Sequence, residues 1–248
     1  MTCLKFLLLL GVAASALNVT AAPDTVPETL SEGPAGRIGE LTEESYYVDG
    51  SNGSAKVFTF TNGHRLLYFI PMIHQAEPAF YEAVAREVKR LKAQGANLYY
   101  EFIDFDAAAD PDKRRIRAML GFLPSPAFYA ENVSDGLVAQ DNEMFLGFPG
   151  GADVNVDVTP AELADAYESQ IGPLQISEEN RSAPLESFVM PTADTTRITQ
   201  VTIDWRNRRL ATAIAGATGD VVVLYGAAHG SGTLRELQAI DPTWRRIE

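Results

Sequence analysis

Cysteine is almost absent from this chain, because its one cysteine, Cys3, stands before an apolar run near the N-terminus. That run, Phe6 to Leu17, follows Lys5 and precedes the small residues Val19-Thr20-Ala21, which is the pattern of a signal peptide cleaved after Ala21. Cleavage at Ala14-Ser15-Ala16 and an uncleaved anchor are the alternatives. Removing residues 1–21 leaves no thiol for a disulfide, a nucleophile or a zinc site. We therefore expect a secreted or periplasmic protein that packing alone stabilises.

Long apolar runs and positive charge are also scarce. A membrane helix needs about 20 apolar residues, so we expect no membrane span after signal cleavage. The chain has 20 Lys and Arg residues against 33 Asp and Glu residues, a formal net charge of −13. Such a chain repels phosphate backbones, which argues against a nucleic-acid partner. Its oligomeric state stays open.

The remaining composition, with 46% hydrophobic residues and 19 glycines, is typical of a folded domain. Residues 22–45 are rich in Pro, Glu, Thr, Ser and Gly and predict an exposed leader segment, so the domain is expected to occupy residues 46–248. Two apolar runs, 57–60 and 66–70, flank Asn62-Gly63 and predict a β-hairpin. His64 lies at this turn, where we expect an exposed polar residue.

Helices and strands alternate beyond the hairpin. Apolar residues at helical spacing predict helices, whereas short aromatic and β-branched runs predict buried strands. The expected helices are 78–94, 159–169, 195–217 and 233–240, and the expected strands are 97–103, 220–225 and, at the edge, 244–247. Several short helices are expected between 111 and 172, with a topology that the sequence leaves open. This order predicts a single α/β domain with a mixed, largely parallel central sheet, flanking helices, an N-terminal β-hairpin and a helical middle insertion.

Three polar residues are placed where they could share a site. His74 and His229 each follow a strand-like run, and Glu101 lies inside another. Ligands of parallel α/β sheets gather beyond the carboxyl ends of the strands. Two imidazoles and a carboxylate are a common ligand set for first-row divalent metals. The alternative is that both histidines are hydrogen-bonded loop residues and that Glu101 pairs with an arginine.

Two further residues are candidates for the same site. Gly226 opens a small-residue turn that lets backbone approach a ligand and leaves room for His229. Arg206 shares a helix face with Ile203 and Leu210, which predicts a partly buried guanidinium that binds a carboxylate or an oxyanion, or else a structural ion pair. The chain has no Gly-x-Ser-x-Gly elbow, phosphate loop, His-Glu-x-x-His helix or dinucleotide fingerprint.

The order of these residues resembles the TraB/GumN family, within the superfamily that includes the Tiki proteases and the ChaN haem-binding proteins. The resemblance spans most of the mature chain and rests on four segments. They are Met72 to Tyr81 around His74, Gly95 to Glu101, Arg206-Asn207 with Leu210-Ala211, and Gly226-Ala227-Ala228-His229. Two positions depart from the pattern: Pro71 stands for the glycine of the first Gly-x-x-His element, and Trp205 stands for a glutamate before Arg206.

This resemblance implies a metal-dependent, peptidase-like hydrolase acting on a peptide or small-molecule substrate. His74, Glu101 and His229 would bind Mn, Co or Zn, and Arg206 would polarise a substrate carbonyl or anchor a carboxylate. Gly226 would lie against the bound cofactor. The missing glutamate keeps open a non-catalytic ligand-binding protein, for example one that binds haem. A structural or surface-interaction protein is the third alternative.

Overall fold

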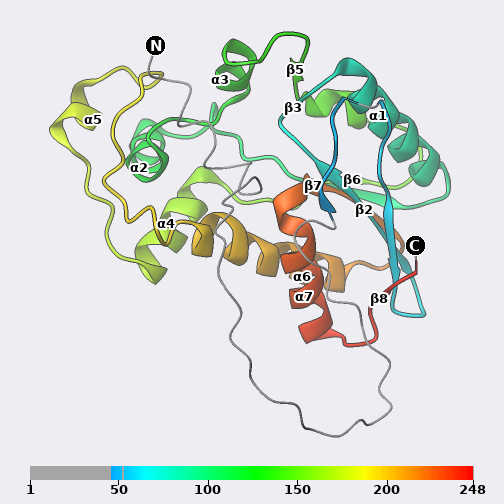
Figure 1. Ribbon diagram of the computed structural model, residues 1–248. Helices are drawn as coiled ribbons and strands as arrows, with labels where there is room; N and C mark the ends of the chain where they lie inside the picture. Colours follow the sequence, from blue (N-terminus) through cyan, green and yellow to red (C-terminus); the bar gives the residue numbers. More distant parts are fainter. Residues whose placement is uncertain (1–45, 52, 248) are drawn as a thin grey trace, which may run out of the picture.

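The computed structural model describes residues 46–51 and 53–247, so the predicted signal peptide and leader, residues 1–45, lie outside the described residues. The helices and strands follow one another along the chain as Figure 1 labels them. They are β1 Phe58–Thr61, β2 Leu66–Met72, β3 Gln75–Ala76, α1 Pro78–Ala93, β4 Asn97–Tyr100, α2 Asp110–Leu120, α3 Pro126–Glu131, β5 Val138–Ala139, η3 Asn142–Phe145, β6 Asp153–Asn155, α4 Pro160–Gln170, α5 Glu178–Ser182, η4 Gln200–Trp205, α6 Arg206–Gly216, β7 Val221–Gly226, η5 Ala227–His229, α7 Gly230–Ile240 and β8 Arg245–Arg246.

Six strands form the central sheet in the order β6-β4-β7-β2-β1-β8. Strands β6, β4, β7 and β2 are parallel, whereas β1 and β8 run antiparallel to their neighbours. The predicted hairpin is confirmed as β1 and β2, and Gly63 at its turn has a φ of 88° that favours glycine. The expected single α/β domain with a mixed, largely parallel sheet is therefore confirmed.

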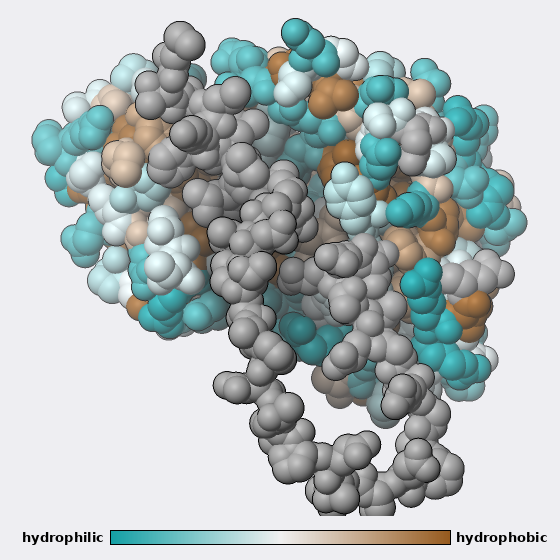
Figure 2. All heavy atoms as spheres, viewed as in Figure 1, coloured by the Kyte–Doolittle hydropathy of each residue, from teal (hydrophilic) through white to brown (hydrophobic). Residues whose placement is uncertain are grey.

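Helices cover both faces of this sheet. Alternate residues of β7 point to opposite faces, so Val223 packs with α6 and α7 whereas Val222 packs with α1. Figure 1 shows α1 on one side of the sheet and α6 and α7 on the other. A third cluster joins α2, α4 and η4 beside the sheet. Hydrophobic residues on the face drawn in Figure 2 form small patches between hydrophilic ones.

The helix expected at 195–217 is the main departure from the predicted elements. Asp194 accepts hydrogen bonds from the backbone N–H and the hydroxyl of Thr196, at 3.1 and 2.5 Å, and this local turn takes the place of the first helical residues. A π-helix, η4, then precedes α6. The prediction of one continuous α-helix over residues 195–217 was therefore wrong, although α6 itself is present.

Strand β4 is shorter than expected, and the helical middle also contributes a strand. β4 ends at Tyr100, so Glu101 follows the strand and does not lie inside it. Strand β6 pairs with β4 in parallel and forms one edge of the sheet. At the other edge, β8 confirms the expected strand near the C-terminus.

No helix in the described part of the chain is both long and apolar enough to cross a membrane.

Candidate functional site

The register of the parallel strands brings the candidate residues to one edge of the sheet. Met72 of β2 is paired with Gly226 of β7, and Tyr100 of β4 is paired with both Leu224 of β7 and Asn155 of β6. The residues just beyond these pairs therefore lie at one level, where the carboxyl ends of parallel strands commonly bind ligands. They are His74, Glu101, Asp157 and His229.

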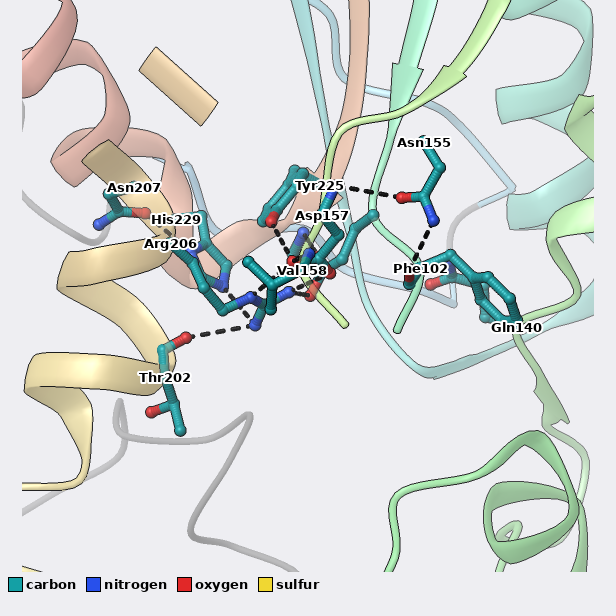
Figure 3. A network of polar contacts seen from close by, with 12 residues as sticks. Phe102, Gln140, Asn155, Asp157, Val158, Thr202, Arg206, Asn207, Tyr225 and His229 are labelled. Atoms are coloured by element: carbon teal, nitrogen blue, oxygen red, sulfur yellow. Dashed lines mark hydrogen bonds and ion pairs between the residues drawn. The ribbon is translucent and has the colours of Figure 1, made fainter. Parts of the chain in front are cut away.

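Arg206 lies at the centre of this set, at the start of α6. It is 8% exposed and uses all five of its N–H groups within the protein. Nε and Nη2 donate to the two carboxylate oxygens of Asp157, at 2.9 and 2.6 Å, and Nη2 also donates to Glu101 Oε1 at 2.5 Å. Nη1 has the two longest contacts, with the Thr202 carbonyl at 3.2 Å and His229 Nε2 at 3.4 Å (Figure 3).

Asp157 is the site residue that the sequence analysis missed. Its side chain has no exposed surface, and it also accepts a hydrogen bond from the Tyr225 hydroxyl at 2.9 Å. Burial raises the pKa of this carboxyl and Arg206 opposes the rise, while the two-pronged contact with Arg206 is typical of an ionised carboxylate. Asp157 therefore neutralises the guanidinium. The only signal in the sequence is an aspartate just before the Thr159 helix cap.

Glu101 is held between Arg206 and the backbone of β7. Its Oε2 accepts the Gly226 N–H at 2.6 Å, and its side chain is 18% exposed. Burial alone would raise the pKa of Glu101, but Arg206 and, to a smaller degree, His229 and His74 lower it to about 2. Glu101 is therefore ionised at neutral pH. A Cβ at Gly226 would lie 3.2 Å from Oε2, so a glycine suits this close approach.

His229 is buried beside Arg206 with a defined tautomer. Its Nδ1 lies 2.7 Å from Asn207 Oδ1, and an amide oxygen only accepts, so Nδ1 carries the proton and Nε2 is left as an acceptor. The ring also packs edge-on against Tyr225, with centroids 4.8 Å apart. Burial, followed by the charge of Arg206, lowers the pKa of His229 to about 3. The imidazole is therefore neutral.

His74 is the exposed member of the set and lies at its rim. Its ring stacks on Tyr129 of α3, with centroids 4.6 Å apart and planes 20° from parallel. Neighbouring protein atoms desolvate the ring and lower the pKa of His74, Glu101 opposes this, and Arg206 adds to it. The His74 side chain is nevertheless exposed, whereas that of His229 is buried. His64 is exposed at the β1–β2 turn.

The structure thus places Glu101, Arg206, Gly226 and His229 in direct contact, with His74 beside them. The pairing of Glu101 with an arginine is the arrangement that the structural alternative predicted. Within residues 46–51 and 53–247, no three His, Cys, Asp or Glu side chains form a group arranged to hold a metal ion. The Glu101 and His229 atoms that would face an ion contact Arg206 instead.

Comparison with models of known families gave no match for this sequence. Searches of curated proteins and of solved structures also returned no match. The resemblance to the TraB/GumN family therefore remains a prediction from the four sequence segments.

Proposed function

We propose that this edge of the sheet is the active site of an exported, peptidase-like hydrolase that uses a divalent ion such as Mn, Co or Zn. The observation that supports the proposal is the charge balance around Arg206. Asp157 neutralises the guanidinium, so Glu101 adds one negative charge in excess beside two neutral imidazoles. A cation compensates such an excess, and these donor types are ones that first-row metals accept.

The donor atoms of His74, Glu101 and His229 suit a divalent metal ion, because they are two imidazole nitrogens and one carboxylate. His229 Nε2 is a free acceptor apart from its 3.4 Å contact with Arg206, and Asn207 already holds the other ring nitrogen in the manner typical of metal-bound histidines. Glu101 Oε1 would have to exchange its contact with Arg206 for the ion. Such an ion would supply activated water.

Arg206 binds and polarises the substrate in this proposal. Its contact with His229 is the longest that it makes, so a substrate oxygen can replace it at the least cost. Nη1 then donates to the carbonyl or carboxylate oxygen, while Asp157 keeps the guanidinium in place. Glu101, ionised at neutral pH, would help to hold the ion. Gly226 orients Glu101 through its N–H.

Metal analysis and peptide cleavage test the proposal on untagged mature protein. We expect about one bound ion per chain, and new peptide ends by mass spectrometry when Mn, Co or Zn is supplied to the metal-free protein with a mixed peptide library. His229→Ala should weaken metal binding by at least about 10-fold, because even the loss of a residue that orients a ligand costs about this much. His64→Ala is the matched control and should bind metal like the native chain. Absence of both metal binding and cleavage contradicts the proposal.

A non-catalytic haem-binding protein is the second candidate. The exposed side chain of His74 favours it, as does the engagement of all five Arg206 N–H groups within the protein. A haem titration should then give a Soret band that His74→Ala removes and His64→Ala leaves intact. Absence of such a band rejects this candidate.

A further inference from the structure

Three aromatic side chains beside the site are left outside the hydrophobic core. Phe122 follows α2, and Phe128 and Tyr129 belong to α3, a helix in which no residue is buried. Each ring is only partly covered, and none of the three belongs to the clusters of buried side chains found in the described residues. A covered aromatic side chain buries roughly 150–250 Å². These rings therefore keep apolar surface that a ligand can cover.

The rings form a continuous row that ends on His74. Phe122 stacks on Phe128 with centroids 4.5 Å apart, and Phe128 meets Tyr129 edge-on at 5.7 Å. Tyr129 in turn stacks on His74 at 4.6 Å. We call these four residues the aromatic row. Offset and edge-on contacts of this kind are the preferred geometries of ring pairs, so the row offers a ready-made surface for a further ring.

The strand contacts of α3 fix the row against the site. Strand β5, which follows α3, pairs with β3 directly after His74, and Gln140 N–H donates to the His74 carbonyl at 2.9 Å. The Gln75 side chain also donates to the Asn132 carbonyl at the end of α3, at 3.0 Å. One end of the row is thus anchored to the segment that carries His74.

The inner end of the row lies within the electrostatic field of the reacting groups. Tyr129, at this end, interacts electrostatically with Glu101 and Arg206. A phenol and two phenyl rings carry no charge at physiological pH. An acidic ligand group placed here would meet the excess negative charge of Glu101, whereas an apolar group would meet neutral rings.

We propose that the aromatic row is the substrate-binding wall of the site and selects peptides with an aromatic or large aliphatic side chain next to the cleaved bond. This inference rests on the proposed hydrolytic function. From His74 at one end, the row continues through Tyr129 and Phe128 of α3 to Phe122, which precedes α3. A substrate bond held at the site thus places its neighbouring side chain on the row.

Paired peptides test this selection. They differ only in the residue next to the cleaved bond, which is Phe, Leu, Gly or Asp, and kcat/KM is compared for the native chain and its variants. We expect Phe and Leu to be preferred over Gly and Asp by about 10-fold or more, as a hydrophobic pocket discriminates. Phe128→Ala should remove this preference. Tyr129→Phe retains an aromatic ring and should retain the preference for Phe and Leu. Ile240→Ala, which changes an exposed apolar residue at the far end of α7, should also retain this preference.

A second measurement separates this inference from the hydrolytic function. Binding of N-acetyl-phenylalanine amide and N-acetyl-aspartate amide is followed by NMR of the aromatic side chains. If the NMR signals of Phe128 and Tyr129 shift with the phenylalanine probe and not with the aspartate probe, the row is supported as a binding wall. Absence of cleavage alongside such shifts would count against the hydrolase only. Cleavage without a preference for Phe or Leu, or a preference that survives Phe128→Ala, overturns the inference and leaves the hydrolase standing. Absence of both cleavage and shifts overturns both.

Discussion

The pairing of Asp157 with Arg206 gives the sharpest test of how the site is held together. Asp157→Asn removes the charge of a carboxylate with no exposed surface and leaves the buried guanidinium with Glu101 alone. Removing one partner of a buried ion pair costs about 3–5 kcal/mol when the other charge is left unpaired, and we expect about 3 kcal/mol because Glu101 still pairs with the guanidinium and asparagine keeps one acceptor. For a chain of this size, such a loss corresponds to a fall in Tm of roughly 6–12 °C. Urea unfolding followed by circular dichroism measures it.

Asp165→Asn is the matched control for this change. Asp165 also pairs with an arginine, Arg115, but its side chain is 70% exposed, so the variant should lose less than about 1 kcal/mol. Arg206→Met combined with Asp157→Asn should cost less than the sum of the two single changes, because Arg206→Met alone leaves Asp157 and Glu101 without their counter-charge and the double change removes one of these carboxylates. A loss at Asp157 no larger than that at Asp165, or strictly additive costs at 157 and 206, would refute the buried pair as the centre of the site.

Two further predictions concern the docking of β6 and the pH dependence of stability. A Cβ at Gly150 would clash with the Lys92 carbonyl, and the φ of 125° disfavours any other residue, so Gly150→Ala should lower the free energy of unfolding by at least about 3 kcal/mol. Gly136→Ala has a φ of 81° but open space, and should cost about 1 kcal/mol in the same urea titration; equal costs would contradict the clash. For metal-free protein, the lowered pKa of His229 means that the unfolded chain binds a proton below about pH 6.5 while the folded chain does so only near pH 3. The free energy of unfolding should thus fall as pH falls from 6.5 to 3, with a smaller slope in His229→Gln; an unchanged slope would contradict the buried neutral imidazole.

Local patterns in the sequence predicted most of the sheet and its covering helices. The Asn62-Gly63 turn, the apolar runs of β4 and β7 and the amphipathic spacing of α1 each carry a strong local signal, because one buried face or one tight turn dictates them. The π-helical start of the α6 region lacked such a signal. Its residues have the apolar spacing of an α-helix, and the turn at Asp194 depends on a single side-chain contact.

The candidate site was predictable only where it follows strong strands. Glu101 and His229 come just after apolar runs, so their convergence could be expected from a parallel sheet alone. Asp157 follows β6, whose three residues Asp153–Asn155 have no run of apolar residues. That strand forms by pairing with β4, and the pairing depends on glycines 150 and 151 lying against the backbone of the α1–β4 connection. Contacts of this kind are tertiary and leave little trace in sequence periodicity.

The position of β6 also bears on Trp205, which stands where the family resemblance predicts a glutamate. An indole carries no charge, and Trp205 packs against the cluster of α2, α4 and η4 with Arg209 over its ring at 5.3 Å. Two carboxylates reach Arg206 from other segments, Asp157 after β6 and Glu101 after β4. Because β6 leads directly to Asp157, the pairing of Arg206 with Asp157 depends on the close approach of residues 150 and 151 to α1 and β4. A substitution there, far from Arg206 along the chain, should therefore disturb the site through its charge as well as through the fold.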